Sequence, residues 1–146
     1  MHFPDLTQYA YEPLKDGMPV LNVGWLGGGN SFPVGALPPD FLHTLKRISR
    51  QCRANQSRGT HACEYCSDPY REIWSIQDGG AKRLLGSAEL WIPSPDQTHI
   101  YAAPDLIIHY VDEHQYKPPA EFVLAVTRFD PDSPWDGKVA SIERLR

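Results

Sequence analysis

Three side chains that can bind a metal ion lie close together in the chain: His61, Cys63 and Cys66. They belong to the segment Arg58–Cys66, which reads Arg-Gly-Thr-His-Ala-Cys-Glu-Tyr-Cys. Thiolate sulfur and imidazole nitrogen are the ligands that suit zinc, and a spacing of two residues between cysteines lets both sulfurs bind one ion. The segment therefore predicts a zinc site that needs a fourth ligand from elsewhere in the chain.

The preferred fourth ligand is His109. A helix holds an imidazole rigidly, and a histidine within Leu-Ile-Ile-His-Tyr-Val is unusual unless it has a partner; the alternative is a core histidine hydrogen-bonded to the backbone. His109 and His114 are five residues apart, so we expect a helix to point them in different directions, with His114 near the helix C-terminus. The other candidates for the fourth ligand are Cys52, His43, His99 and His114.

The same residues permit two kinds of chemistry. With three protein ligands and a bound water, zinc would act as a hydrolase centre, and Glu89 is the candidate general base. Glu89 follows Ala88 in a predicted strand, however, where a carboxylate on the outward face needs no functional explanation. A thiol redox pair is the second alternative, although Cys63 and Cys66 lie in a polar loop and not at a helix N-terminus. Unliganded thiols are the remaining interpretation.

The length of 146 residues fits a single domain over 1–146 with one hydrophobic core. The formal net charge of −4 and the pI of about 5.8 argue against a binder of nucleic-acid backbones. A local basic run is interpreted as the solvated face of a helix; it comprises Lys46, Arg47, Arg50, Arg53 and Arg58.

No apolar run approaches the roughly 20 residues that a membrane helix needs, and the N-terminus lacks a basic start and a hydrophobic segment. Three cysteines, an odd number, fit a reducing compartment better than a disulfide framework. We therefore expect a cytoplasmic protein.

Hydrophobic periodicity predicts three helices. Phe41, Leu45, Ile48 and Cys52 form one apolar stripe of a helix that ends near Arg53. A second helix runs from Leu106 to about His114. A third carries a buried stripe of Phe122, Ala125, Val126 and Phe129.

Short apolar runs predict the strands: 20–26, then 88–92 and 99–102, the last two joined as an antiparallel hairpin. Residues 54–83 read as an irregular segment of roughly thirty residues, a length that is uncommon unless something such as a metal pins it. Residues 1–18 read as an extended arm and residues 130–146 as a tail that adds a strand or short helix. The expected fold is α+β, with a small antiparallel sheet of about three strands, about three helices and a long metal-pinned loop.

Four motifs together resemble a family of small bacterial proteins, common in actinobacteria and myxobacteria, that is known only as a domain of unknown function. The motifs are Val-Gly-Trp-Leu at 23–26, the 58–66 segment, Gly-Ser-Ala-Glu at 86–89, and the long run from Tyr101 to Phe122 that contains His-Tyr-Val-x-x-His-x-Tyr-x-Pro-Pro-x-Glu-Phe. The resemblance covers about residues 4–128. It implies a compact bacterial domain with His61, Cys63, Cys66 and His109 at motif positions, and it implies no activity.

The sequence favours a zinc-stabilised binding module over an enzyme. Its acidic charge would steer it to a protein with a basic surface, and Tyr70 and Trp74 are candidate anchors in a loop. The alternative is that both rings pack over the core. A toxin-neutralising (immunity) protein is the concrete form of this hypothesis, because such proteins are small, often acidic and without catalytic machinery. That step is an analogy.

Overall fold

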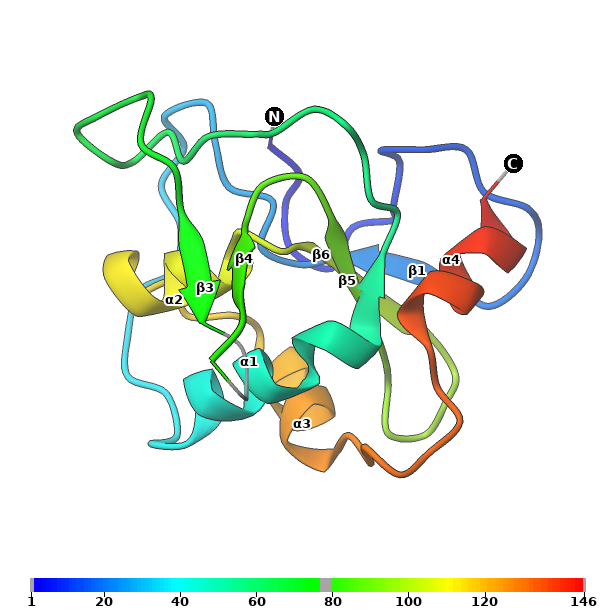
Figure 1. Cartoon of the computed structure of the whole chain (residues 1–146). Coiled ribbons are helices and arrows are strands. Elements are labelled where there is room, and N and C mark those ends of the chain that lie inside the picture. The colour runs from blue at the N-terminus through cyan, green and yellow to red at the C-terminus, as the bar shows by residue number, and fades with distance from the viewer. Residues whose placement is uncertain (1, 77–79, 146) are drawn as a thin grey trace.

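The computed structural model describes residues 2–76 and 80–145, and these residues form an α+β fold (Figure 1). The helices are α1 (Phe41–Cys52), α2 (Ile107–His114), α3 (Ala120–Arg128) and α4 (Gly137–Arg144). The strands are β1 (Val20–Asn22), β2 (Arg53–Ala54), β3 (Trp74–Ile76), β4 (Lys82–Leu84), β5 (Glu89–Pro93) and β6 (Ile100–Pro104). The predicted α+β class is confirmed.

The main sheet is mixed, with strand order β1-β6-β5-β2. β5 and β6 form the predicted antiparallel hairpin, with Trp91 opposite Ala102. β1 runs parallel to β6, with Leu21 opposite Tyr101, so the prediction of a wholly antiparallel sheet is wrong in this respect. A parallel pair joins segments far apart in sequence, and no local pattern announces it.

Residues 54–83 were predicted to be irregular, but the described parts of this segment, 54–76 and 80–83, contain short strands. β2 continues directly from α1 and pairs with β5, so α1 delivers the chain to the edge of the main sheet. β3 and β4 form a separate two-stranded hairpin, with Ser75 opposite Arg83. Strands of two or three residues are too short to give a clear periodic signal.

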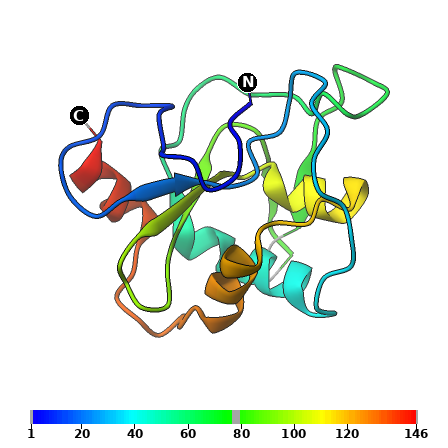
Figure 2. The same cartoon turned by 180° about the vertical axis from the view of Figure 1, so that it is seen from behind.

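The sheet buries both of its faces, and the pleat decides which residues meet which layer. Leu90, Ile92 and Tyr101 pack into a large core with α1, α2 and α3. Trp91, Ile100 and Ala102 point the other way into a second core, which the N-terminal arm and α4 cover. Seen from behind, the arm passes across the sheet near β1 (Figure 2).

The N-terminal arm adds aromatic rings to that second face. Tyr9 is buried, its backbone N–H donates to the Val20 carbonyl at 2.8 Å, and its ring packs edge-on against Trp91. Phe3 packs edge-on against Trp25. The face of β5 that carries Glu89 and Trp91 is therefore covered.

The predicted tail contains α4, the helical alternative of the two expected. Asp136 caps its N-terminus by accepting N–H bonds from Lys138 and Val139. A Cβ atom at Gly137 would lie 2.1 Å from the Cys52 carbonyl oxygen, so only glycine allows α4 to start against the end of α1. No helix within 2–76 or 80–145 is long and apolar enough to cross a membrane.

Candidate metal centre

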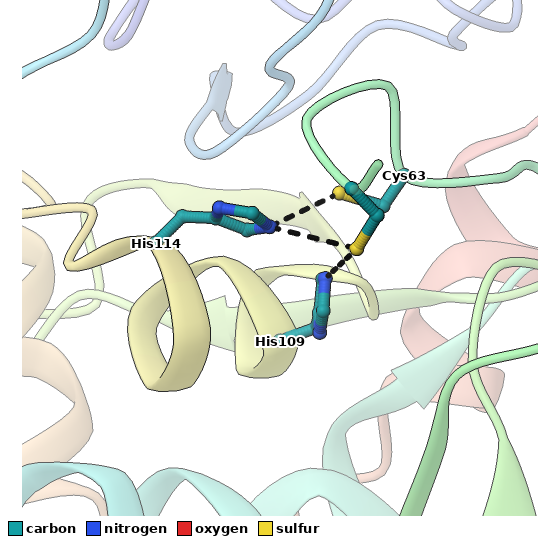
Figure 3. Close-up of side chains that lie close together, drawn as sticks. Cys63, His109 and His114 are labelled. Carbon is teal, nitrogen blue, oxygen red and sulfur yellow. Dashed lines mark hydrogen bonds between the residues drawn. The ribbon is translucent and has the colours of Figure 1, made fainter. Parts of the chain in front are cut away.

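Cys63, Cys66, His109 and His114 bring one potential ligand atom each to a single point. All four atoms lie within 4.8 Å of one another. Cys63 and Cys66 flank the turn at residues 64–65, the histidines come from α2, and the labelled side chains of Cys63, His109 and His114 point toward each other (Figure 3). The Cys63 and His109 side chains are buried, which excludes most competing water.

The spacing of the donors matches a tetrahedral zinc shell. With Zn–S of about 2.3 Å and Zn–N of about 2.0 Å, neighbouring sulfur and nitrogen ligands lie about 3.6 Å apart. His114 Nε2 lies 3.4 Å from Cys63 Sγ and 3.7 Å from Cys66 Sγ, and His109 Nε2 lies 3.3 Å from Cys66 Sγ. These three distances match such a shell, and the other donor pairs lie within 4.8 Å, so the cluster is a possible metal site.

His109 is oriented by an outer partner. Its Nδ1 lies 2.9 Å from the Glu113 carboxylate one turn along α2, which leaves Nε2 to face the sulfurs. Arg71 holds Glu113 through two N–H bonds of 3.0 and 2.9 Å, and its Nη1 also lies 3.5 Å from Cys66 Sγ. A carboxylate behind a ligating histidine fixes the ring and makes it a better donor.

Local electrostatics suit metal binding. Burial lowers the pKa of His109 against the opposing effect of Glu113, so the ring is neutral and can ligate. Burial raises the pKa of the Cys63 thiol, which by itself disfavours the thiolate that a metal needs. The Tyr65 backbone N–H donates to Cys63 Sγ at 3.4 Å and favours the thiolate, which a cation would stabilise far more strongly.

His114 joins the cluster although the five-residue spacing was expected to separate it from His109. Helical side chains tilt toward the helix N-terminus, and His114 is the last residue of α2, so its ring lies back over the preceding turn. The two imidazole centroids lie 5.0 Å apart. That expectation was wrong because it considered rotation about the helix axis alone.

The structure brings three of the four predicted ligands together and places His61 elsewhere. His61 is exposed, its Nε2 lies 3.3 Å from the Tyr11 hydroxyl, and its backbone N–H donates to the Gly86 carbonyl at 2.8 Å. Among the other candidates, Cys52 is buried in the core, His43 is exposed on α1, and His99 bonds the Tyr101 hydroxyl.

The loop around His61 is held by a second set of contacts. A Cβ atom at Gly86, whose φ is +115°, would lie 2.3 Å from the His61 carbonyl oxygen, so glycine permits this close approach. The Gly86 N–H donates at 2.7 Å to the buried carboxylate of Asp105. These contacts carry the His61 side chain toward Tyr11 and away from the cysteines.

Glu89 is buried, with 2% of its surface exposed, and does not lie on an outward face as expected. Its carboxylate accepts from Tyr9 Oη at 3.0 Å, Asn55 Nδ2 at 2.6 Å and Trp91 Nε1 at 2.8 Å. Burial raises its pKa despite these three donors. None of its partners belongs to the Cys–His cluster.

Most of the chain matches one known protein family. Residues 1–127 match the model of a family described as Domain of unknown function (DUF7919). The chain belongs to this family. The resemblance inferred from the motifs is thereby confirmed, and the match ends before α4. No curated protein and no solved structure matches the chain.

The sequence contains a signal for the carboxylate that orients His109. His109 and Glu113 stand four residues apart, the spacing at which helical side chains meet. A histidine with a carboxylate at that spacing is a common arrangement for orienting a metal ligand. Arg71, by contrast, reaches the site only through the fold.

Proposed function

We propose that Cys63, Cys66, His109 and His114 bind one structural Zn²⁺ ion, and that the domain is a zinc-stabilised protein-binding module. The observation that carries the first part is the convergence of four donor atoms within 4.8 Å. Two thiolates and two imidazoles form a donor set typical of structural zinc, and two thiolates neutralise its charge.

A structural role is supported by the number of ligands. Four protein donors fill a tetrahedron and leave no position for the water of a hydrolase. Glu89, the alternative general base, is committed to Tyr9, Asn55 and Trp91. The redox alternative receives no support from placement, since Cys63 and Cys66 lie in a turn and not at the start of a helix.

The ion would join the segment between β2 and β3 to helix α2. That segment contains no helix or strand of its own, and ligation would offset the entropy lost in ordering it. The ion would also help to fix the position of β3, because Arg71, which lies just before this strand, contacts Cys66 of the cluster.

The binding surface is proposed to include the exposed rings beside this segment. Tyr70 is 90% exposed, Trp74 is 52% exposed and Ile76 is 60% exposed. Aromatic anchors of this kind contribute much of the energy of protein interfaces, and the net charge of −4 favours a partner with a basic surface. A toxin-neutralising (immunity) role in the cytoplasm is the specific form that we propose.

Metal analysis of protein purified without added zinc tests the site. We expect about one zinc per chain. Cys63→Ser should lower both metal content and thermal stability, because ligation free energy is folding free energy. Cys52→Ala is the matched control, since it removes a buried thiol outside the cluster and should keep the metal. Less than about 0.2 equivalents in folded protein would contradict the proposal.

Retention of proteins from bacterial lysate tests the binding role. Tyr70→Ala and Trp74→Ala should weaken retention of a specific partner, and added salt should slow its association. Val139→Ala is the control, because Val139 is 50% exposed on α4. A partner held equally by all three variants would exclude these rings as anchors, and no retained protein at low salt would contradict the binding role.

A further inference from the structure

A cavity of about 290 Å³ is lined in part by the 55–66 loop, and none of the four Cys–His cluster residues lines it. Tyr11 from the N-terminal arm and His61 and Glu64 from the loop line it, together with Trp25, Glu89 and Tyr110. The exposed His61 marks its mouth, whereas the almost fully buried Glu89 marks its inner end. The volume suits a small molecule of a few heavy atoms.

The Glu89 carboxylate at the inner end has unused acceptor capacity. A carboxylate offers about four lone-pair sites, and three are taken by Tyr9, Asn55 and Trp91. All three donors are neutral. No lysine or arginine in the described ranges forms an ion pair with Glu89. A buried carboxylate in this state lacks the positive partner that would stabilise its charge.

The walls offer aromatic rings and further negative charge. The Tyr11 and Trp25 rings lie 5.3 Å apart, and Trp25 is fixed by an Nε1–H bond of 2.9 Å to the Ala102 carbonyl. Glu64 holds its carboxylate at the rim through the Gly28 N–H at 2.9 Å. None of the described residues that line the cavity is a lysine or an arginine.

We propose that this cavity binds a small organic ammonium ion, with the charge placed against Glu89 and the carbon groups against Tyr11 and Trp25. A carboxylate supplies the counter-charge and an N–H acceptor, and aromatic faces attract a desolvated cation. An anion would meet two carboxylates and no positive side chain. A neutral apolar molecule would leave the remaining acceptor site of Glu89 unused.

A matched pair of probes tests the charge requirement. Binding of n-butylammonium and of n-butanol, which have the same chain length, is measured by calorimetry on zinc-loaded wild-type protein. We expect the amine to bind at least about tenfold more tightly, the ratio that a desolvated cation–π contact supplies. Equal affinity for the two probes, or no binding of the amine, would overturn the proposal. Zinc content measured in the same samples excludes an effect through metal loss.

Two variants with little risk to folding test the residues. Tyr11→Leu removes a partly exposed ring and should weaken amine binding about tenfold. Glu64→Gln should weaken it about two- to fivefold, whereas Glu72→Gln makes the same charge change outside the cavity and should leave it unchanged. Unchanged affinity in Tyr11→Leu would overturn the assignment. Glu89→Gln should abolish the preference for the amine over the alcohol.

Discussion

The Cys–His cluster and the Glu89 carboxylate flank the same 55–66 loop, but their polar atoms are satisfied in different ways. The cluster atoms contact chiefly one another, at 3.3–3.7 Å between sulfur and nitrogen. The Glu89 oxygens instead accept three hydrogen bonds from protein donors. Each cluster sulfur also accepts one N–H bond, from Tyr65 or from Arg71, but the four donor atoms converge on one point and suit a cation there. The Glu89 carboxylate has its own donors and is held in place before any ligand arrives.

The first prediction compares the replacement of His114 by alanine with the replacement of His61 by alanine. A four-ligand zinc site binds with about 10–16 kcal/mol, so His114→Ala should cost about 3–4 kcal/mol of metal affinity. His61→Ala should leave zinc affinity unchanged, because His61 lies at the Tyr11 side of the loop. Competition with a chromogenic chelator measures both values. Zinc loss in His61→Ala with retention in His114→Ala would reverse the assignment.

The sequence alone predicts that Cys63 and Cys66 lie together and where α1 lies, and the reasons are local. Two cysteines two residues apart can reach one ion in almost any turn. The apolar stripe from Phe41 to Cys52 coincides with α1, because helical periodicity alone identifies it.

The remaining inferences needed contacts between distant segments. His61 is held at the cavity by the hydrogen bond from its backbone N–H to the carbonyl of Gly86, which is 25 residues further along the chain. Glu89 was expected in solvent, since nothing in its own strand shows that Tyr9 and Asn55 cover it. β1 beside β6 is likewise visible only after folding.

The second prediction concerns Asp105, which anchors the cavity side of the loop through Gly86. Burial raises the pKa of Asp105 to about 6, although the Gly86 N–H opposes this. The unfolded value is about 3.9, so the folded state binds the proton more tightly. Stability from this group is present below about pH 4 and is lost as the pH rises to about 6, by about 3 kcal/mol.

Asp105→Asn should therefore remove this pH dependence. Urea unfolding of zinc-loaded wild type and variant at pH 4.5 and pH 7 measures it, and other titrating groups cancel in the difference between the two proteins. The variant should gain relative to wild type as the pH rises. A constant difference at both pH values would show that Asp105 is not responsible.

The third prediction tests the carboxylate partner of His109. Glu113→Gln should weaken zinc binding about 10–100-fold, because the carboxylate orients His109 and is itself fixed by Arg71. Asp112→Asn removes the same charge from the neighbouring exposed position on α2 and is the control. If both variants weaken zinc binding equally, overall charge and not orientation explains the effect.

The smallest expected effect comes from Glu89→Gln, which tests whether the two sides of the loop are independent. The amide keeps one acceptor oxygen but places an NH₂ group against a protein donor, either the Trp91 indole or the Tyr9 and Asn55 pair. That mismatch costs about 1–3 kcal/mol, and the loss of a buried charge offsets part of it. Net destabilisation of about 1 kcal/mol is expected, with zinc content unchanged, since no Glu89 partner is a metal ligand. Zinc loss in this variant would mean that the carboxylate supports the metal through the loop, and the two regions would then form one coupled site.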